Sequence, residues 1–506
     1  MAQDQSTAAT VATPGPMAAS GAWRLSWPLV VAIYAVLLTL HRAHVEQALL
    51  LDGDTYWHIA AGQWILEHRA VPAQDPFSYT MWGARWTDQE WLSEVLFALL
   101  HDARGWNAVV GATALAFGAT CALLCRALLR TLEPARALVF TALAVSMALP
   151  HLFARPFALA MPVMVLWTAG LVRGADDGRS PSLWLAPLMT VWANLHGGYT
   201  LGIAIACGFG AEAFVAAWQR GRVLDTVRSW GTFLLVALLA SLLTPHGVNG
   251  YLFTWQVLAE DTFALDRVGE WASPNFHVYQ PLLLWLLAGL AVVLHQGLRL
   301  PWMRLMLLLA LLYLALAHVR NVEILGLLAP LIVAAPFASQ WQQRKVRAAS
   351  GSRGMALQKL VPPAGMGGLL AGLALVLACS LAFERARPLE LPQSAVPAQA
   401  LAAARQAGLQ GRVFNDYGWG GYLIYAGIPP FVDGRSDVYR DAFLRRYIDA
   451  VDLQAPGALE QVLDEYRVSW TLLRPKMSAI VLLDRLPGWH RVYADKDAVI
   501  HARTVP

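Results

Sequence analysis

Two aspartates separated by one glycine, Asp52 and Asp54, are the residues in this chain whose type and spacing most clearly suggest chemistry. Two carboxylates at this spacing can share a divalent cation, Mg²⁺ or Mn²⁺, with diphosphate oxygens. Alternatively, one of them can act as the general base toward an acceptor hydroxyl. Such pairs are common in proteins. This pair is a stronger candidate because it follows the first long apolar segment and begins an amphipathic stretch.

Other polar residues recur at the ends of later apolar segments. Arg155 and Arg320 are suited to a phosphate, because a guanidinium pairs with phosphate oxygens through two hydrogen bonds. Ionisable groups at membrane depth are candidates for function, although capping and snorkelling at the membrane surface is the simpler explanation for any single one. We predict substrate-binding roles for His58, Trp57, Arg155, Asn194, His196, His246, Arg320 and Asn321.

The elements that must position these residues are apolar helices. Hydrophobic residues make up 57% of the chain and charged residues 14%, whereas a soluble protein carries roughly a quarter charged residues. The net charge of +4 is small and scattered, which argues against nucleic acid as a partner. A membrane span needs about 20 mostly apolar residues. About eleven spans are predicted, at 25–43, 106–129, 135–150, 156–172, 182–195, 199–218, 230–245, 280–297, 302–318, 321–340 and 362–383.

Charges between these spans predict the orientation, because cytoplasmic gaps are enriched in Lys and Arg. With a cytoplasmic N-terminus, the cytoplasmic gaps contain Arg24, Arg126, Arg130, Arg136, Arg173, Arg179, Arg220, Arg222, Arg228, Arg299, Arg304, Arg344, Lys345, Arg347, Arg353 and Lys359. The opposite gaps are rich in acids, namely Asp52, Asp54, Asp75, Asp88, Glu90, Glu94, Glu260, Asp261, Asp266 and Glu270. Residues 1–22 are predicted to be a disordered cytoplasmic tail, and the first span is expected to be retained rather than cleaved.

The predicted transmembrane domain, 23–383, includes a long first outer loop at 46–104. Two amphipathic helices are expected in this loop, one ending near His68 and one beginning at Asp88, both in the membrane interface. The loop is rich in tryptophan, which suits an interfacial aromatic belt as well as stacking on sugar rings. The sequence therefore predicts that Asp52 and Asp54 lie on the outer side.

Eleven spans place residues 384–506 on the outer side as well. After a proline-rich linker, this segment predicts a small α/β domain, with strands at 412–415, 430–433, 469–473, 490–493 and 498–501 and helices at 399–407, 440–452, 457–466 and 476–486. Two polar clusters follow the first two of these strands, where ligands favour the edge of a sheet, although Asp-Gly and Gly-Gly are also common turn formers. The candidate acceptor-binding residues are Asp416, Trp419, Asp433 and Arg435.

An acidic pair after the first span, interfacial helices and many further spans resemble the GT-C membrane glycosyltransferases. This superfamily includes the protein O-mannosyltransferases, the aminoarabinose transferases and the oligosaccharyltransferase catalytic subunits. A closer resemblance, to a group of bacterial GT-C-type membrane proteins, rests on 53–58 (GDTYWH), 75–80 (DPFSYT), 194–198 (NLHGG) and 432–435 (VDGR). The acidic motif found in a second outer loop of some relatives has no clear match here.

The resemblance implies inverting transfer of a sugar from a polyprenyl-phosphate donor to an envelope glycan, lipid or protein. Asp54 matches the catalytic acidic position and Asp52 its companion. The expected location is the bacterial cytoplasmic (inner) membrane, with a periplasmic C-terminal domain. Two alternatives remain: a transporter or flippase, whose polar residues would lie near the midplane within repeated segments, and a non-catalytic scaffold of a polysaccharide assembly system.

Overall fold

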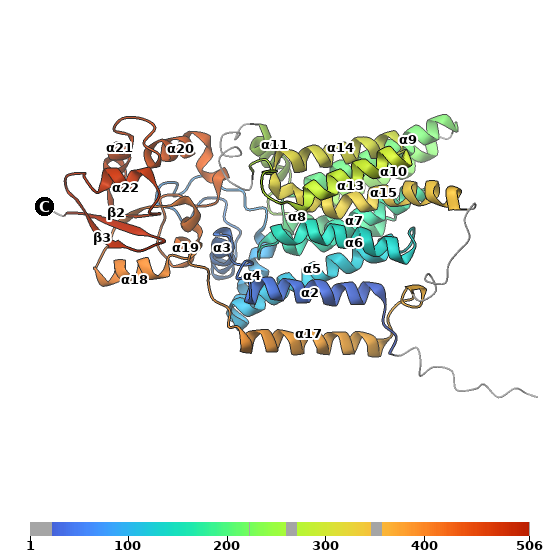
Figure 1. The fold of residues 1–506 in the computed structure, drawn as a ribbon. Helices are drawn as coiled ribbons and strands as arrows, with labels where there is room; N and C mark the ends of the chain where they lie inside the picture. Colours follow the sequence, from blue (N-terminus) through green and yellow to red (C-terminus); the bar gives the residue numbers. More distant parts are fainter. Residues whose placement is uncertain (1–22, 222, 260–270, 346–356, 505–506) are drawn as a thin grey trace, which may run out of the picture.

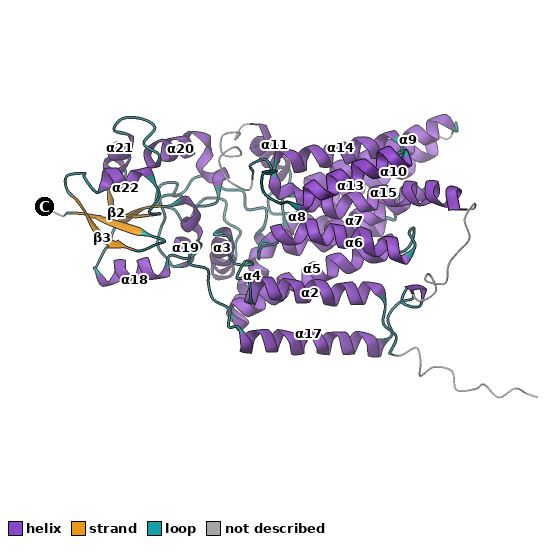
Figure 2. Cartoon of the chain, in the orientation of Figure 1, coloured by secondary structure: helices purple, strands orange, loops and turns teal. Residues whose placement is uncertain are grey.

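A computed structural model describes residues 23–221, 223–259, 271–345 and 357–504. The predicted tail at 1–22 lies outside the described residues, as do the charged residues Arg222, Glu260, Asp261, Asp266, Glu270, Arg347 and Arg353. Figure 1 shows a long helical bundle, with a smaller α/β domain at one end and the helices α3 and α4 near the junction between them. Figure 2 shows that the strands are confined to the C-terminal domain.

Each of the eleven predicted spans contains a helix. The bundle helices are α2 (Trp27–His44), α5 (Trp106–Leu128), α6 (Pro134–Ala148), α7 (Pro156–Asp176), α8 (Ala186–Leu195), α9 (Tyr199–Gln219), α10 (Val223–Ser241), α13 (Pro281–Gln296), α14 (Trp302–Ala317), α15 (Val322–Lys345) and α17 (Met366–Ala386). Within the described residues, seven helices are long and apolar enough to cross a membrane. The protein is therefore a multi-pass membrane protein, while the number of eleven spans stays a prediction.

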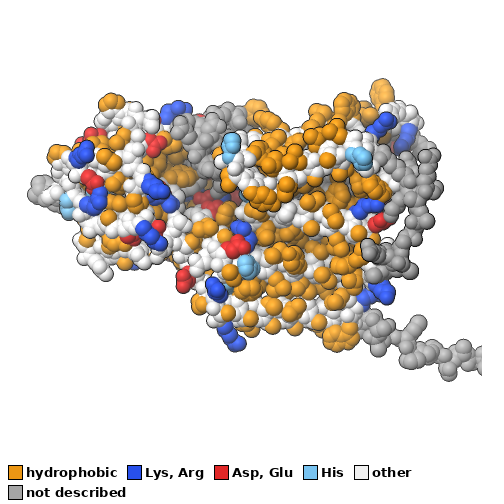
Figure 3. All heavy atoms as spheres, in the orientation of Figure 1, with side chains coloured by type: hydrophobic (Ala, Val, Ile, Leu, Met, Phe, Trp, Pro, Cys, Tyr) orange, Lys and Arg blue, Asp and Glu red, His pale blue; other side chains and the backbone are white. Residues whose placement is uncertain are grey.

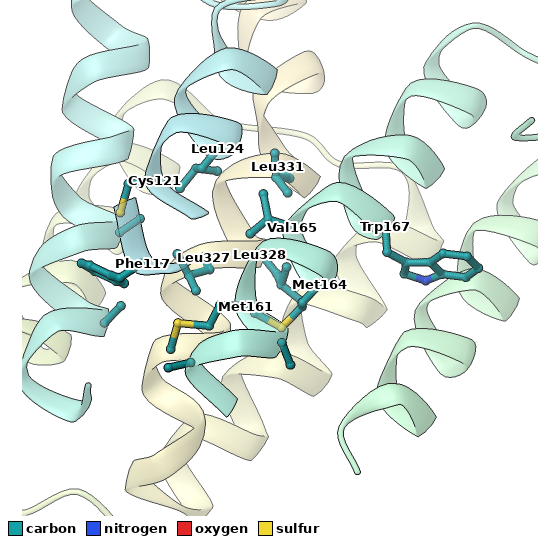
Figure 4. Packing of buried hydrophobic residues seen from close by; sticks show 14 of the residues in the cluster. Phe117, Cys121, Leu124, Met161, Met164, Val165, Trp167, Leu327, Leu328 and Leu331 are labelled. Carbon is teal, nitrogen blue, oxygen red and sulfur yellow. The ribbon is translucent and has the colours of Figure 1, made fainter. Parts of the chain in front are cut away.

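The centre of the bundle is built from α5, α7 and α15. Phe117, Leu124, Met164 and Leu328 are fully buried there, as Figure 4 shows. Gly118 lets α2 approach α5 closely, since a methyl group at this position would lie 2.6 Å from a methyl carbon of Val36. Outer helices such as α13 and α17 instead expose many leucines (Figure 3). This pattern is expected for helices surrounded by lipid, which need no polar outer face.

A buried cluster of charges joins three helices at the bundle end opposite the C-terminal domain. Arg304 of α14 is 3% exposed, and it donates to Asp176 at 2.6 Å and to Glu212 at 3.0 Å. From the sequence, the arginines on this side were attributed only to the orientation of the protein in the membrane. For Arg304 this interpretation is incomplete. Its charge is paired inside the protein and connects α7, α9 and α14.

The first outer loop forms the two predicted helices, α3 (Asp54–His68) and α4 (Trp91–Arg104). Helix α3 packs between α4 and the short α19 (Gly420–Tyr425) of the C-terminal domain. Tyr56 and Ile59 of α3 are fully buried, so this helix is covered largely by protein. Helix α11 (Asn249–Ala259) was not predicted; it begins directly after the turn that contains His246.

The C-terminal domain contains a mixed four-stranded sheet with the order β1-β2-β4-β3. Its strands are β1 (Arg412–Asn415), β2 (Val468–Leu473), β3 (Trp489–Ala494) and β4 (Val499–Arg503), of which only β1 and β2 pair in parallel. Its remaining helices are α18 (Ala398–Gln406), α20 (Ser436–Val451), α21 (Ala458–Glu465) and α22 (Ser478–Leu483).

The strand predicted at 430–433 is wrong, because this segment is a loop. The Asn415 side chain takes the place of a neighbouring strand: its oxygen accepts from the Phe431 N–H at 2.8 Å, and its amide group donates to the Val432 carbonyl at 2.7 Å. The backbone is therefore satisfied by a side chain instead of a ladder.

Candidate active site

A cavity of about 1310 Å³ lies between the end of the bundle and the C-terminal domain. Figure 3 shows acidic side chains gathered in the hollow between these two parts. Its walls come from the start of α3, the segment before α4, the start of α7, the turn before α9, the segment before α15, and the loops before α19 and α20. Segments far apart in the sequence thus meet at one end of the bundle.

Asp52 and Asp54 lie in this cavity and share one guanidinium. Arg155, which immediately precedes α7, donates to Asp52 at 2.8 Å and also to Asp54. Asp52 also accepts the Asp54 N–H at 2.9 Å, which helps to start α3. The Trp57 indole donates to Asp54 at 3.0 Å. Among the described residues, the Arg155 guanidinium thus bonds to both carboxylates, and the three side chains are 10–19% exposed.

This arrangement does not fit the predicted divalent cation. The Arg155 guanidinium bonds to one oxygen of each carboxylate, and the other oxygens accept from the Asp54 N–H and the Trp57 indole. Within the described part of the chain, no group of three or more His, Cys, Asp or Glu side chains has the arrangement of a metal site. We therefore derive no step through a metal ion.

A second cluster of titratable residues lies at the wall of the same cavity; it contains the predicted His58 and His196 and two acids that were not predicted as site residues, Glu90 and Glu94. Glu90 is 25% exposed and lies 3.1 Å from Nε2 of His196 and 3.5 Å from Nε2 of His58. Nδ1 of His58 is in turn 2.8 Å from Glu94. The sequence signal was present, since three acids occur within seven residues at 88–94. Only the fold shows that they meet two histidines from different segments.

Burial dominates the electrostatics of this cluster. It raises the pKa of Glu90 to about 8, although Arg155 and Arg320 oppose the rise. Burial also raises the pKa of Glu94 well above its ordinary value, assisted by the neighbouring Asp88. The pKa of His196 falls to about 3 and that of His58 falls well below its ordinary value, chiefly through burial, so both rings are neutral. Glu90 therefore has a pKa near neutral pH, as expected for a residue at a functional site.

Arg320 and Asn321, which precede α15, also line the cavity, and their predicted contact with substrate stays a prediction. The Arg320 guanidinium lies 4.4 Å from the ring centroid of Trp271. The amide of Asn321 donates to the Leu314 carbonyl at 3.2 Å. This wall therefore presents a cation beside an aromatic ring.

Asn194 and His246 are not among the described residues that line the cavity. Asn194 accepts from the Trp91 indole at 2.8 Å and donates to the carbonyls of Thr190 and Leu243. Nε2 of His246 lies 2.6 Å from the Asp88 carbonyl oxygen. Both side chains contact the segment around the start of α4, so their predicted contact with substrate stays a prediction.

The predicted acceptor-binding residues are mostly enclosed by protein. Trp419 and Asp433 are fully buried, and Asp416 is 6% exposed and bound to Arg474. Arg435 reaches the cavity wall but is only 2% exposed. The sequence reasoning missed Asp437, which lines the cavity and whose pKa burial raises to about 7. Acceptor binding by the four predicted residues stays a prediction.

Comparison with known proteins identifies the fold. No protein-family model and no curated protein matches the chain. Among solved structures, the oligosaccharyltransferase AglB from Archaeoglobus fulgidus, in its apo form and in complex with an inhibitory peptide and a dolichol-phosphate, matches with a TM-score of 0.52 at 10% identity over 88% of this chain and 69% of that chain. Apo ArnT from Cupriavidus metallidurans matches with a TM-score of 0.49 at 13% identity over 94% of this chain and 97% of that chain.

The chain thus shares the fold of a polytopic membrane protein, the oligosaccharyltransferase AglB. This likeness agrees with the resemblance that the motifs in the sequence indicate.

Proposed function

We propose that this protein transfers a sugar from a polyprenyl-phosphate donor to an acceptor hydroxyl on the outer side of the bacterial inner membrane. The observation that carries the proposal is the Asp52–Asp54–Arg155 cluster in a cavity at one end of a bundle with the GT-C fold. The structural neighbour AglB was solved with a dolichol-phosphate, which is a lipid phosphate of this class.

The cavity wall supports a lipid-linked donor. Beside its polar part lies an apolar part formed by Met161, Leu201, Val257, Leu314 and Ile324. These residues belong to helices of the bundle and to α11, so a polyprenyl chain could pass from the membrane into the cavity between them. Arg320 and Arg155 stand in the polar part, where a phosphate gains most from guanidinium groups.

The proposed reaction is a single displacement that inverts the anomeric carbon. The acceptor oxygen attacks this carbon, the bond from the carbon to the phosphate oxygen breaks, and polyprenyl phosphate leaves. The hydroxyl proton passes to a carboxylate of the protein. Asp54 and Glu90 are the two candidates for this role, and the raised pKa of Glu90, about 8, suits a base near neutral pH.

The orientation in the membrane is part of the proposal. The arginines in the gaps opposite the C-terminal domain support a cytoplasmic N-terminus. The cavity and the C-terminal domain would then face the periplasm. The acceptor would be an envelope glycan, a lipid or a protein.

The proposal is tested by complementing a deletion strain with the wild-type gene or with Asp54→Asn, and comparing the envelope glycans by mass spectrometry. We expect the deletion to remove a sugar that the wild type restores and Asp54→Asn does not. Asp177→Asn is the matched control, since Asp177 is exposed on a loop and pairs with Arg179. If properly inserted Asp54→Asn restores the sugar fully, the catalytic assignment fails, and the transporter and scaffold alternatives gain support.

A further inference from the structure

The glycine-bearing loops of the C-terminal domain lie directly on the Asp52–Asp54 loop. A methyl group on Gly434 would overlap the Asp54 carboxylate, and the three atoms nearest to that methyl position all belong to Asp54. A methyl group on Gly421 would overlap the Gly53 carbonyl, and one on Gly53 would overlap the Gly418 carbonyl. The two loops can approach this closely only because these positions carry no side chain.

A buried ion-pair network holds Gly434 at this position. Arg435 donates to Asp75 of the first outer loop at 2.7 Å, and to the two oxygens of Asp433 at 2.8 Å each. Tyr439 donates to Asp433 at 2.6 Å. The three charged side chains are at most 2% exposed, and removing one partner from such a network leaves a buried charge uncompensated.

Two further hydrogen bonds connect the same parts of the chain. Thr80 donates to the Phe431 carbonyl at 2.7 Å, and Tyr79 donates to the Val413 carbonyl at 2.9 Å. The first outer loop is thus bound both to β1 and to the loop that precedes α20. The domain is fixed to this loop over several contacts, and Gly434 is the part of it that contacts Asp54.

We propose that the C-terminal domain is a fixed wall of the reaction site, in which Gly434 is a positioning residue for the Asp54 carboxylate and Arg435 holds Gly434 through Asp75. This inference rests on the proposed function for its catalytic consequence, but not for the contact itself. It assigns the Asp433-Gly434-Arg435 turn to the geometry of the site, in place of the acceptor contact predicted for Asp433 and Arg435. The docked domain then fixes the position of Asp54 together with Arg155 and Trp57.

The contact is tested without any substrate by a double-mutant cycle in the purified full-length protein. The variants are Gly434→Ala, Asp54→Gly and both together, compared by thermal unfolding in detergent. The backbone at Gly434 does not have a positive φ, so the added methyl group acts through its neighbours. We expect Gly434→Ala to lower the melting temperature when Asp54 is present, and to have little effect in the Asp54→Gly background.

An equal loss in both backgrounds would overturn the contact, and so would failure of both Gly434 variants to fold while Asp54→Gly folds. If only the single Gly434→Ala variant fails to fold, the contact is supported. Gly289→Ala is the matched control, because a methyl group there meets nothing within 4 Å in α13. We expect this control to leave the melting temperature unchanged.

The positioning role is tested by transfer kinetics and by binding of undecaprenyl phosphate as the probe. We expect folded Gly434→Ala to lower kcat about 100-fold, as for a catalytic group displaced by about 1 Å, with a nearly unchanged Kd for the probe. An unchanged kcat, or a loss confined to KM, overturns the positioning role. Absence of transfer by the wild type would instead overturn the proposed function, while the unfolding cycle would still decide the contact.

Discussion

The replacement Glu90→Gln is expected to stabilise the protein above neutral pH and to impair transfer. Glu90 lies between His58 and His196 in the cavity, and burial raises its pKa from 4.5 to about 8. An unfolded chain releases this proton near pH 4.5, whereas the folded protein keeps it until about pH 8. The unfolded state therefore binds fewer protons across this window, so the stability of the wild type falls as the pH rises.

The size of the effect follows from the same pKa values. At about 1.4 kcal/mol for each pKa unit, the rise from 4.5 to about 8 gives an upper bound of about 5 kcal/mol. Glu90 is 25% exposed to the cavity, and solvent screening reduces the expected loss to about 2–3 kcal/mol. Gln is isosteric and carries no titrating proton. The difference between Glu90→Gln and wild type should therefore grow from about pH 5 to pH 8 and then level off.

The assay is thermal unfolding of both proteins between pH 5 and pH 9, together with transfer rates over the same range. If Glu90 accepts the hydroxyl proton, log kcat of the wild type rises with pH up to about 8, and Glu90→Gln removes this dependence. Glu67→Gln is the control, since Glu67 is exposed on α3. A pH-independent difference in melting temperature would refute the burial argument. An unchanged pH–rate profile in Glu90→Gln would refute the role as base.

Arg155→Met should lower transfer about 100-fold, because Asp52 and Asp54 lose the cation that holds them; the exposed Arg179→Met on the opposite side should retain the wild-type rate in the same assay. Arg304→Met should lower the free energy of unfolding by about 3 kcal/mol by leaving Asp176 and Glu212 unpaired, while the Kd for undecaprenyl phosphate stays that of the wild type; a changed Kd would contradict a purely structural role. EDTA should leave the transfer rate in place, since Arg155 already bonds to both carboxylates; a rate that falls with EDTA and returns with Mg²⁺ or Mn²⁺ would show that a cation displaces Arg155.

Local sequence patterns were enough for most of the elements. The eleven helices of the bundle follow from runs of apolar residues, and four of the five predicted strands follow from short apolar runs between turn residues. The fifth, at 430–433, does not pair with β1, because the side chain of Asn415 at the end of β1 bonds to its backbone instead. A residue pattern shows that a segment can form a strand, whereas tertiary contacts decide whether it does.

The candidate site was predictable in its location but not in its pairings. Asp54, Arg155 and Arg320 each lie in a gap between predicted spans, and every second gap lies on the same side of the membrane. Their common location at one end of the bundle therefore follows from the order of the spans. Two charged side chains pair only when they lie within a few ångströms of each other. The spacing of residues in a sequence does not determine such distances between segments. Arg155 bonds to Asp52 and Asp54 in the structure, and its predicted contact with a phosphate stays a prediction.

This pairing has a physical consequence for the order of events in the proposed reaction. A donor phosphate that approaches Arg155 competes with two carboxylates already bonded to the same guanidinium. If the phosphate forms a hydrogen bond with Arg155, Asp54 loses its own bond to that guanidinium. A carboxylate that loses a neighbouring cation becomes a stronger base. Gly434 meanwhile prevents the carboxylate from turning toward the C-terminal domain. Once the donor phosphate has taken its place beside Arg155, the contact with Gly434 would leave Asp54 facing the cavity and the acceptor.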